Sequence, residues 1–76
     1  MAVIRLPEIE EIFTVLERVG VSREAVVIPL TKRDPGAIRV MNDGRLEIVA
    51  PESMSVHDWL PALEREIRSV IEGSGA

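Results

Sequence analysis

The sequence predicts an α+β domain in which two helices cover one face of a three-stranded antiparallel sheet, in the order α-β-β-β-α. Three observations support this fold class. Apolar residues recur at helical spacing near both ends of the chain. Between them, short runs rich in Val and Ile are separated by turn signals that contain glycine and proline. A two-layer arrangement buries both helical stripes and one sheet face in a single core.

The first helix is expected from Pro7 to Val19. Its apolar residues form one stripe, made of Ile9, Ile12, Phe13, Leu16 and Val19. Pro7 suits the first helical position, and Gly20 is expected to end the helix in a left-handed conformation. Residues 1–6 are expected either to add a fourth strand to the sheet or to lead into this helix as an ordered arm.

The first strand is expected at residues 26–30, V-V-I-P-L. Pro29 cannot donate a ladder hydrogen bond, so this strand should lie at an edge of the sheet or carry a bulge. The following Asp34-Pro35-Gly36 predicts a type II turn, with proline at the second position and glycine at the third.

A β-hairpin is the strongest local pattern, with strands at residues 37–41 and 45–50. A three-residue loop, Asn42-Asp43-Gly44, puts Gly44 where the chain needs a left-handed conformation. In this register, residues directly opposite each other share a face of the sheet. The side chains expected to point at the helices are Ile38, Val40, Leu46 and Ile48.

The last helix is expected over residues 55–72. Its apolar stripe consists of Val56, Trp59, Leu60, Leu63, Ile67, Val70 and Ile71. Two starting points stay open. With Ser55 as the N-cap, Pro61 lies in the second turn and removes a helical hydrogen bond, whereas with Asp58 as the N-cap Pro61 falls in the first turn. Residues 1–72 are expected to form the single domain, followed by a disordered tail at residues 73–76.

Size and composition limit the possible classes of protein. A chain of 76 residues forms one domain. It contains no cysteine, which excludes disulfides and favours a cytoplasmic protein. It also has no apolar run of the roughly 20 residues that a membrane span needs. Glutamine is absent and asparagine occurs once, which fits either a thermophilic protein or GC-rich codon usage.

The sequence lacks a set of residues suited to catalysis. His57 is the only histidine, and its neighbour Asp58 would point in a different direction on a helix. One histidine and no cysteine do not supply the ligands of a catalytic zinc site. The glycines lie in separate turns and do not form a phosphate-binding loop. We therefore expect a protein that is not an enzyme, with no catalytic, cofactor-binding or metal-binding residues.

The expected function is a binding or accessory role through the open face of the sheet or an edge strand. Such a face would mix apolar and charged residues, and the expected interface comprises Val27, Arg39, Met41, Arg45, Glu47 and Val49. A chain this small buries a limited fraction of its surface and has no disulfide to stabilise it. We therefore expect a homodimer that joins sheet faces or edge strands, or binding to a separate protein partner.

The alternative function is RNA binding through a basic strip on the sheet and on the 31–36 loop. The strip would comprise Lys32, Arg33, Arg39 and Arg45. Residues 18–45 carry a net charge of +3, whereas the segments before and after them carry −3 and −4, so any nucleic-acid surface would be local. The element order is similar to that of double-stranded-RNA-binding domains. The last helix, however, begins S-V-H-D-W-L-P, without the basic run expected for phosphate binding.

Overall fold

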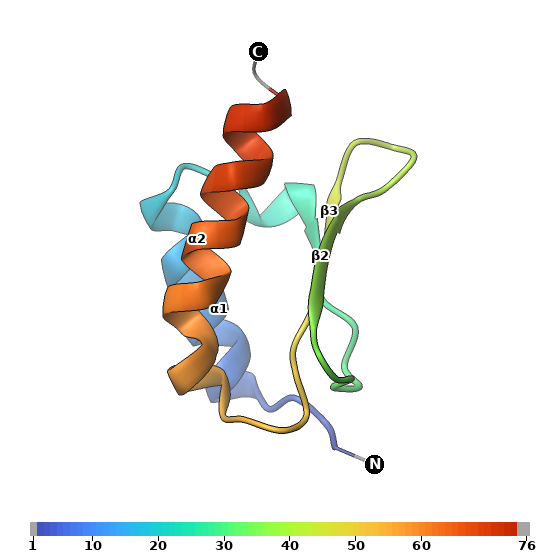
Figure 1. Cartoon of the computed structure of the whole chain (residues 1–76), viewed down its shortest axis with the longest axis vertical. Helices are drawn as coiled ribbons and strands as arrows, with labels where there is room; N and C mark the ends of the chain where they lie inside the picture. Colours follow the sequence, from blue (N-terminus) through green and yellow to red (C-terminus); the bar gives the residue numbers. More distant parts are fainter. Residues whose placement is uncertain (1, 75–76) are drawn as a thin grey trace.

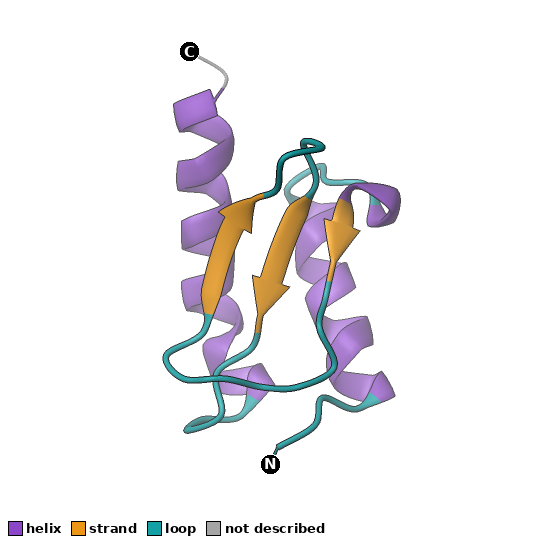
Figure 2. Cartoon of the chain, turned by 90° about the vertical axis from the view of Figure 1, so that its right-hand side faces the viewer, coloured by secondary structure: helices purple, strands orange, loops and turns teal. Residues whose placement is uncertain are grey.

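The computed structural model describes residues 2–74, which form two packed layers (Figure 1). The elements in chain order are α1 (Leu6–Arg18), the 3₁₀ turn η1 (Arg23–Ala25), β1 (Val26–Val27), β2 (Ala37–Val40), β3 (Leu46–Val49) and α2 (Val56–Ser74). Figure 2 shows both helices behind the same face of the sheet, which leaves the other face open. The predicted α+β class is therefore confirmed.

The sheet is mixed, and the prediction of a purely antiparallel sheet is wrong. Its strand order is β1-β3-β2, with β3 parallel to β1 and antiparallel to β2. The segment 28–36 leaves β1 and crosses the end of β3 on the open side before it enters β2 (Figure 2). The length of this segment permits the crossing, and β1 pairs with β3 instead of with β2, its neighbour in sequence. β1 does lie at an edge of the sheet, as Pro29 predicted.

The β2–β3 hairpin has the predicted loop and register. Gly44 has a φ of +89°, and the Met41 N–H donates to the Arg45 carbonyl at 2.7 Å across the three-residue loop. The paired residues are Ala37 with Val49, Ile38 with Ile48, Arg39 with Glu47 and Val40 with Leu46. Local turn chemistry and alternation of side chains were therefore sufficient to place this hairpin.

α1 ends, and α2 begins, at a capping residue that the sequence predicted. Gly20 has a φ of +86°, and the Val21 N–H donates back to the Leu16 carbonyl at 2.8 Å, which closes α1. The Ser55 Oγ accepts a hydrogen bond from the Asp58 N–H at 3.1 Å, so Ser55 is the N-cap of α2. α2 continues through Pro61. It also includes residues 73 and 74, whereas residues 75–76 of the expected tail lie outside the described residues.

The core lies between the helices and the inner face of the sheet. Its buried apolar side chains are Ile4, Ile12, Val15, Leu16, Ile48, Ala50, Val56, Trp59, Leu63 and Ile67. The predicted core position of Val40 is wrong, because this side chain is 56% exposed. Val40 shares a face with Leu46, which is buried, but it is the last residue of an edge strand. The side chains that cover the central strand β3 therefore do not cover Val40.

The N-terminal arm pairs with the segment that follows β1. Val3 and Thr31 form an antiparallel bridge, flanked by hydrogen bonds from the Ile4 N–H to the Leu30 carbonyl at 2.7 Å and from the Lys32 N–H to the Ala2 carbonyl at 2.9 Å. This contact is a single bridge and does not add a strand to the three-stranded sheet. Of the two arrangements expected for residues 1–6, the structure therefore shows the ordered arm for the residues it describes.

Candidate functional site

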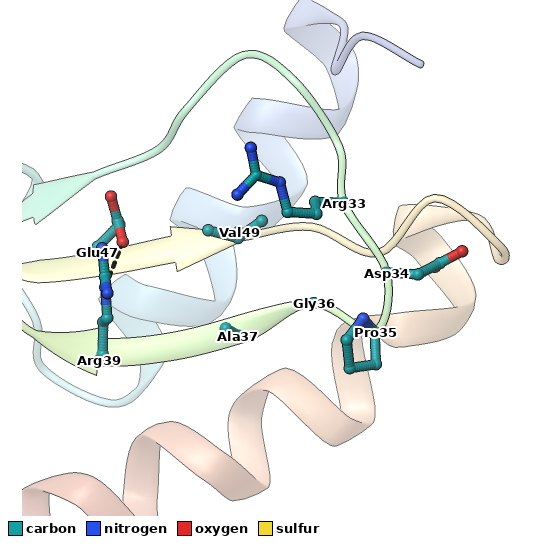
Figure 3. Close-up of a pocket in the computed structure, with 8 residues that line it drawn as sticks. All are labelled: Arg33, Asp34, Pro35, Gly36, Ala37, Arg39, Glu47 and Val49. Carbon is teal, nitrogen blue, oxygen red and sulfur yellow. Dashed lines mark hydrogen bonds and ion pairs between the residues drawn. The ribbon is translucent and has the colours of Figure 1, made fainter. Parts of the chain in front are cut away.

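A groove lies on the open face of the sheet, between strands β2 and β3 and the segment 28–36 (Figure 3). It has a volume of about 210 Å³. The residues that line it are Arg33, Asp34, Pro35, Gly36, Ala37, Arg39, Glu47 and Val49. A neighbouring hollow shares Arg33, Arg39, Glu47 and Val49 and extends the same surface to Pro29 and Thr31. We call this surface the open-face groove.

The wall of the groove is a turn that is tied to the end of β3. The Gly36 N–H donates to the Arg33 carbonyl at 2.7 Å, and the Arg33 N–H donates to the Ala50 carbonyl at 2.8 Å. The turn therefore spans residues 33–36, and the Asp34–Pro35 peptide bond is cis. The predicted type II turn is wrong, because Pro35 occupies the third position of the turn and not the second.

Asp34 anchors this turn to the segment that leads into α2. Its Oδ1 accepts hydrogen bonds from the backbone N–H groups of Glu52 and Ser53, both at 2.8 Å. These hydrogen bonds, chiefly that from Ser53, lower the pKa of Asp34 below its ordinary value of 3.8. In Figure 3 the carboxylate points away from Arg33 and from the strands. Asp34 therefore stabilises the wall of the groove and leaves the Arg33 charge uncompensated.

Gly36 allows the turn to approach the end of β3 closely. Its φ is +82°, in the left-handed region that favours glycine. A Cβ at this position would lie 3.1 Å from both the Val49 carbonyl oxygen and Pro51 Cδ. Glycine is thus favoured at this position for two reasons, its backbone conformation and the limited space beside it.

Two arginines contribute to the groove, but they differ in their partners. The Arg39 Nε lies 2.6 Å from Glu47 Oε1, so this cross-strand ion pair is locally neutral. Arg33 is exposed and forms no ion pair within residues 2–74. Its side chain extends from the turn toward Val49 (Figure 3). The open-face groove therefore combines a free guanidinium group with an apolar floor.

Three of the predicted interface residues line this groove, namely Arg39, Glu47 and Val49. Val27 pairs with Glu47 in the β1–β3 register and lies on the same face of the sheet. Met41 and Arg45 lie beyond the strands, at the hairpin loop. The groove is thus narrower than the expected interface and lies at the opposite end of the sheet from the hairpin tip.

The four residues of the predicted basic strip are divided between three places. Arg33 and Arg39 line the groove. The Lys32 Nζ binds Glu8 Oε2 on α1 at 2.9 Å, and this hydrogen bond lowers the pKa of Glu8. Arg45 binds Asp43 at the hairpin tip, with 2.7 Å between Nε and Oδ2. The structure therefore brings together only two of the four cations.

Thr31 and Pro35 lie in the 31–36 loop of the alternative RNA-binding prediction but were not predicted as site residues, and Ala37 was predicted in neither surface. The Asp-Pro-Gly motif did mark a turn at this point. The turn lies beside the end of β3 because it directly precedes Ala37, which pairs with Val49 in the β2–β3 hairpin.

Outside the groove, residues 2–74 offer few side chains suited to catalysis or to metal binding. The His57 Nδ1 lies 3.2 Å from Glu11 Oε1 on the surface, and the His57 side chain is 77% exposed. Within residues 2–74, no cluster of three or more His, Asp or Glu side chains is suited to hold a metal ion. In the same range, neither helix has the length and apolar character required to cross a bilayer.

Comparisons with known proteins give no further assignment. No family model matches the chain, and neither the curated proteins nor the solved structures contain a significant match.

Proposed function

We propose that this protein is a non-catalytic binding module whose open-face groove receives an extended acidic segment of a partner protein. The observation that carries the proposal is the position of Arg33, an exposed cation without an ion-pair partner in residues 2–74, beside the half-buried Val49. A segment with a carboxylate next to an apolar side chain complements these two features. Arginine suits this role, because its planar guanidinium group binds carboxylates in a bidentate manner.

The charges around the groove support a ligand with a single well-placed anion. Arg39 and Glu47 neutralise each other, and Asp34 is occupied by the backbone of residues 52 and 53. Arg33 is therefore the charged side chain with which a carboxylate of an incoming ligand can form an ion pair. Because the site is open to solvent, one ion pair contributes modestly, about 0.2–1 kcal/mol. Most of the affinity would come from apolar contact with Val49, Ala37 and Pro29.

A titration followed by NMR tests the proposal. The probe is a synthetic peptide that alternates leucine with glutamate and has blocked ends, and its partner probe has glutamine in place of glutamate. We expect the acidic peptide to shift the backbone amide signals of Arg33, Ala37 and Val49. The glutamine peptide should bind more weakly, because it lacks the carboxylate that pairs with Arg33.

Two variants make the titration specific. Arg33→Ala should weaken binding of the acidic peptide about two- to fivefold, the loss expected for one exposed ion pair. Arg65→Ala is the matched control, since Arg65 is an exposed arginine on α2, away from the groove, with no ion pair in residues 2–74. Absence of any shift in the groove, or equal effects of the two variants, would contradict the proposal.

RNA binding is the alternative function, and the same NMR titration with an RNA oligonucleotide in place of the peptide distinguishes it. An RNA ligand would bind mainly through its phosphate charges. The logarithm of its binding constant would therefore fall steeply and linearly with the logarithm of the salt concentration. The division of the four basic residues between three places favours a protein ligand over a polyanion. A single-stranded RNA oligonucleotide that shifts the groove signals with such a salt dependence would replace the first proposal by the second.

The oligomeric state and the cellular location of the protein belong to the same proposal. We propose that the protein acts as a homodimer, because its small core has no disulfide to supplement it. Light scattering coupled to size-exclusion chromatography tests the dimer. The cytoplasmic location expected from the sequence also stays part of this proposal, and cell fractionation tests it.

A further inference from the structure

The backbone of Thr31 has polar groups that no other described residue uses. Thr31 lies opposite Val3 in the antiparallel bridge, and its neighbours Leu30 and Lys32 make the hydrogen bonds of that bridge. In such a pair, the N–H and C=O of the residue between them point away from the partner strand. Within residues 2–74, neither of these two groups of Thr31 forms a hydrogen bond. Thr31 therefore keeps one donor and one acceptor for a ligand.

These two groups point toward the hollow that extends the open-face groove. The hollow is lined by Pro29, Thr31, Arg33, Arg39, Glu47 and Val49. Three of these residues belong to β2 and β3, so the hollow lies on the sheet side of the segment, away from the arm. Arg33, two residues after Thr31, donates its N–H toward that side, to the Ala50 carbonyl just past β3. A ligand in the hollow therefore meets the backbone of Thr31 beside the guanidinium group of Arg33.

The groove is closed at the end where Arg33 lies. There the turn at residues 33–36 is held by the hydrogen bond from Arg33 to Ala50, at 2.8 Å. The Asp34 carboxylate also ties this turn to the backbone of residues 52 and 53. An internal segment of a partner would have to pass over this wall, whereas a chain end stops at it. The closed end therefore favours a chain terminus over a continuous segment.

We infer that the groove binds the free C-terminal carboxylate of a partner protein whose last residue is apolar. This inference rests on the proposed function and places the anion of the bound segment at its chain end. One carboxylate oxygen pairs with the Arg33 guanidinium group, and the other accepts the Thr31 N–H. The N–H of the same terminal residue donates to the Thr31 carbonyl, and its side chain contacts Val49.

A terminal apolar residue satisfies all of these groups at once. Its N–H and one carboxylate oxygen exchange with Thr31 the two hydrogen bonds of an antiparallel residue pair. Its second oxygen remains for Arg33, and its side chain starts from the same carbon atom as the carboxylate. Arg33 and Val49 lie close together in the groove (Figure 3), as this arrangement requires. An internal glutamate could pair with Thr31 and Arg33, but that residue would then have no apolar side chain for Val49.

Three acetylated tetrapeptides test this inference by NMR titration. The first is acetyl-Gly-Ala-Leu-Val with a free carboxylate, and the second is its C-terminal amide. The third is acetyl-Gly-Leu-Glu-Leu amide, whose carboxylate lies inside the chain. We expect the free acid to bind about fivefold more tightly than either amide, because it alone places a carboxylate and an apolar side chain on one residue. It should also shift the amide proton of Thr31 downfield.

Two variants separate the backbone of Thr31 from its side chain. Thr31→Pro removes the N–H and should weaken binding of the free acid about tenfold, the loss expected for a hydrogen bond to a charged group. Thr31→Val is the matched control, because it keeps the N–H and the branched shape, and it should leave the affinity unchanged. Circular dichroism verifies folding, and if Thr31→Pro fails to fold, the three peptides on the unmodified chain decide.

The outcomes distinguish this inference from the proposed function. Equal binding of the free acid and its amide overturns the chain-end inference, and so does a glutamate peptide that binds as tightly as the free acid. The proposed function stands in both cases if the glutamate peptide shifts the groove signals. If no peptide shifts the signals of Arg33 and Val49, both are overturned. Equal weakening by the two Thr31 variants also overturns the inference, because the backbone N–H would then not be the binding group.

Discussion

Replacement of Gly36 by alanine should destabilise the protein more than the same change at its other left-handed glycines. Gly20, Gly36 and Gly44 have φ values of +86°, +82° and +89°, so a Cβ carries nearly the same backbone penalty at each. That penalty is about 1–2 kcal/mol for an L-residue. The three positions differ in their surroundings, which makes the glycines controls for one another.

The magnitude at Gly36 follows from the contacts that an added methyl group would make. Nothing lies within 4 Å of a Cβ at Gly20 or Gly44, whereas at Gly36 the Val49 carbonyl and the buried Pro51 ring lie at 3.1 Å. Neither neighbour is a flexible side chain, so the turn must move. Overpacking of this kind costs about 1–3 kcal/mol. We therefore expect Gly36→Ala to lose that amount beyond the loss in Gly44→Ala.

Urea denaturation followed by circular dichroism measures the three free energies of unfolding under the same conditions. In thermal melts, each kcal/mol should lower the midpoint by roughly 4–8 °C for a domain of this size. Equal destabilisation by Gly36→Ala and Gly44→Ala would refute the reasoning. That result would mean that the turn at residues 33–36 yields without cost and does not form a fixed wall of the groove.

Three further predictions follow from individual contacts. Lys32→Met should lower the free energy of unfolding by about 1 kcal/mol, because it removes the partly buried ion pair with Glu8, and denaturant titration measures this loss. Ile67→Ala should lower the free energy of unfolding by about 2–5 kcal/mol, because the removal of this fully buried side chain leaves a cavity in the core. The same denaturant titration measures this loss. A loss below about 1 kcal/mol would contradict the tight packing of Ile67. The pKa of Asp34 is lowered in the folded state, so its contribution to stability is complete above the ordinary value of 3.8 and disappears as the pH falls through the folded value. Asp34→Asn should therefore lose stability at neutral pH and show a shallower decline in acid than the unmodified chain, which acid titrations of both proteins compare.

Features that depend on near neighbours in the chain could be predicted from the sequence. The β2–β3 register follows from the Asn42-Asp43-Gly44 loop and the alternation of side chains around it. The end of α1 at Gly20 has the same local origin. At α2 the sequence left Ser55 and Asp58 both open as caps, and the structure selects Ser55 because packing of Val56 and Trp59 in the core stabilises the first turn in spite of Pro61.

The candidate site was predicted less completely. Arg39, Glu47 and Val49 were expected on the open face, and the structure places them in the groove. The Asp-Pro-Gly pattern predicts a turn but not the wall that residues 33–36 form, because the wall depends on contacts of this turn with residues 49–51. The bond from the Arg33 N–H to the Ala50 carbonyl joins segments that have no common pattern in the sequence.

By itself, the sequence determined the helices, the hairpin and its two faces, because capping, turn conformation and side-chain alternation act within a few residues. Only the tertiary structure decided that β1 pairs in parallel with β3, that Val40 stays exposed and that Arg33 lies over the end of β3. The first two outcomes depend on which strand lies at the centre of the sheet. The central strand is determined by the arrangement that buries the most apolar surface. Every segment contributes to this burial, so it cannot be predicted from one segment of the sequence.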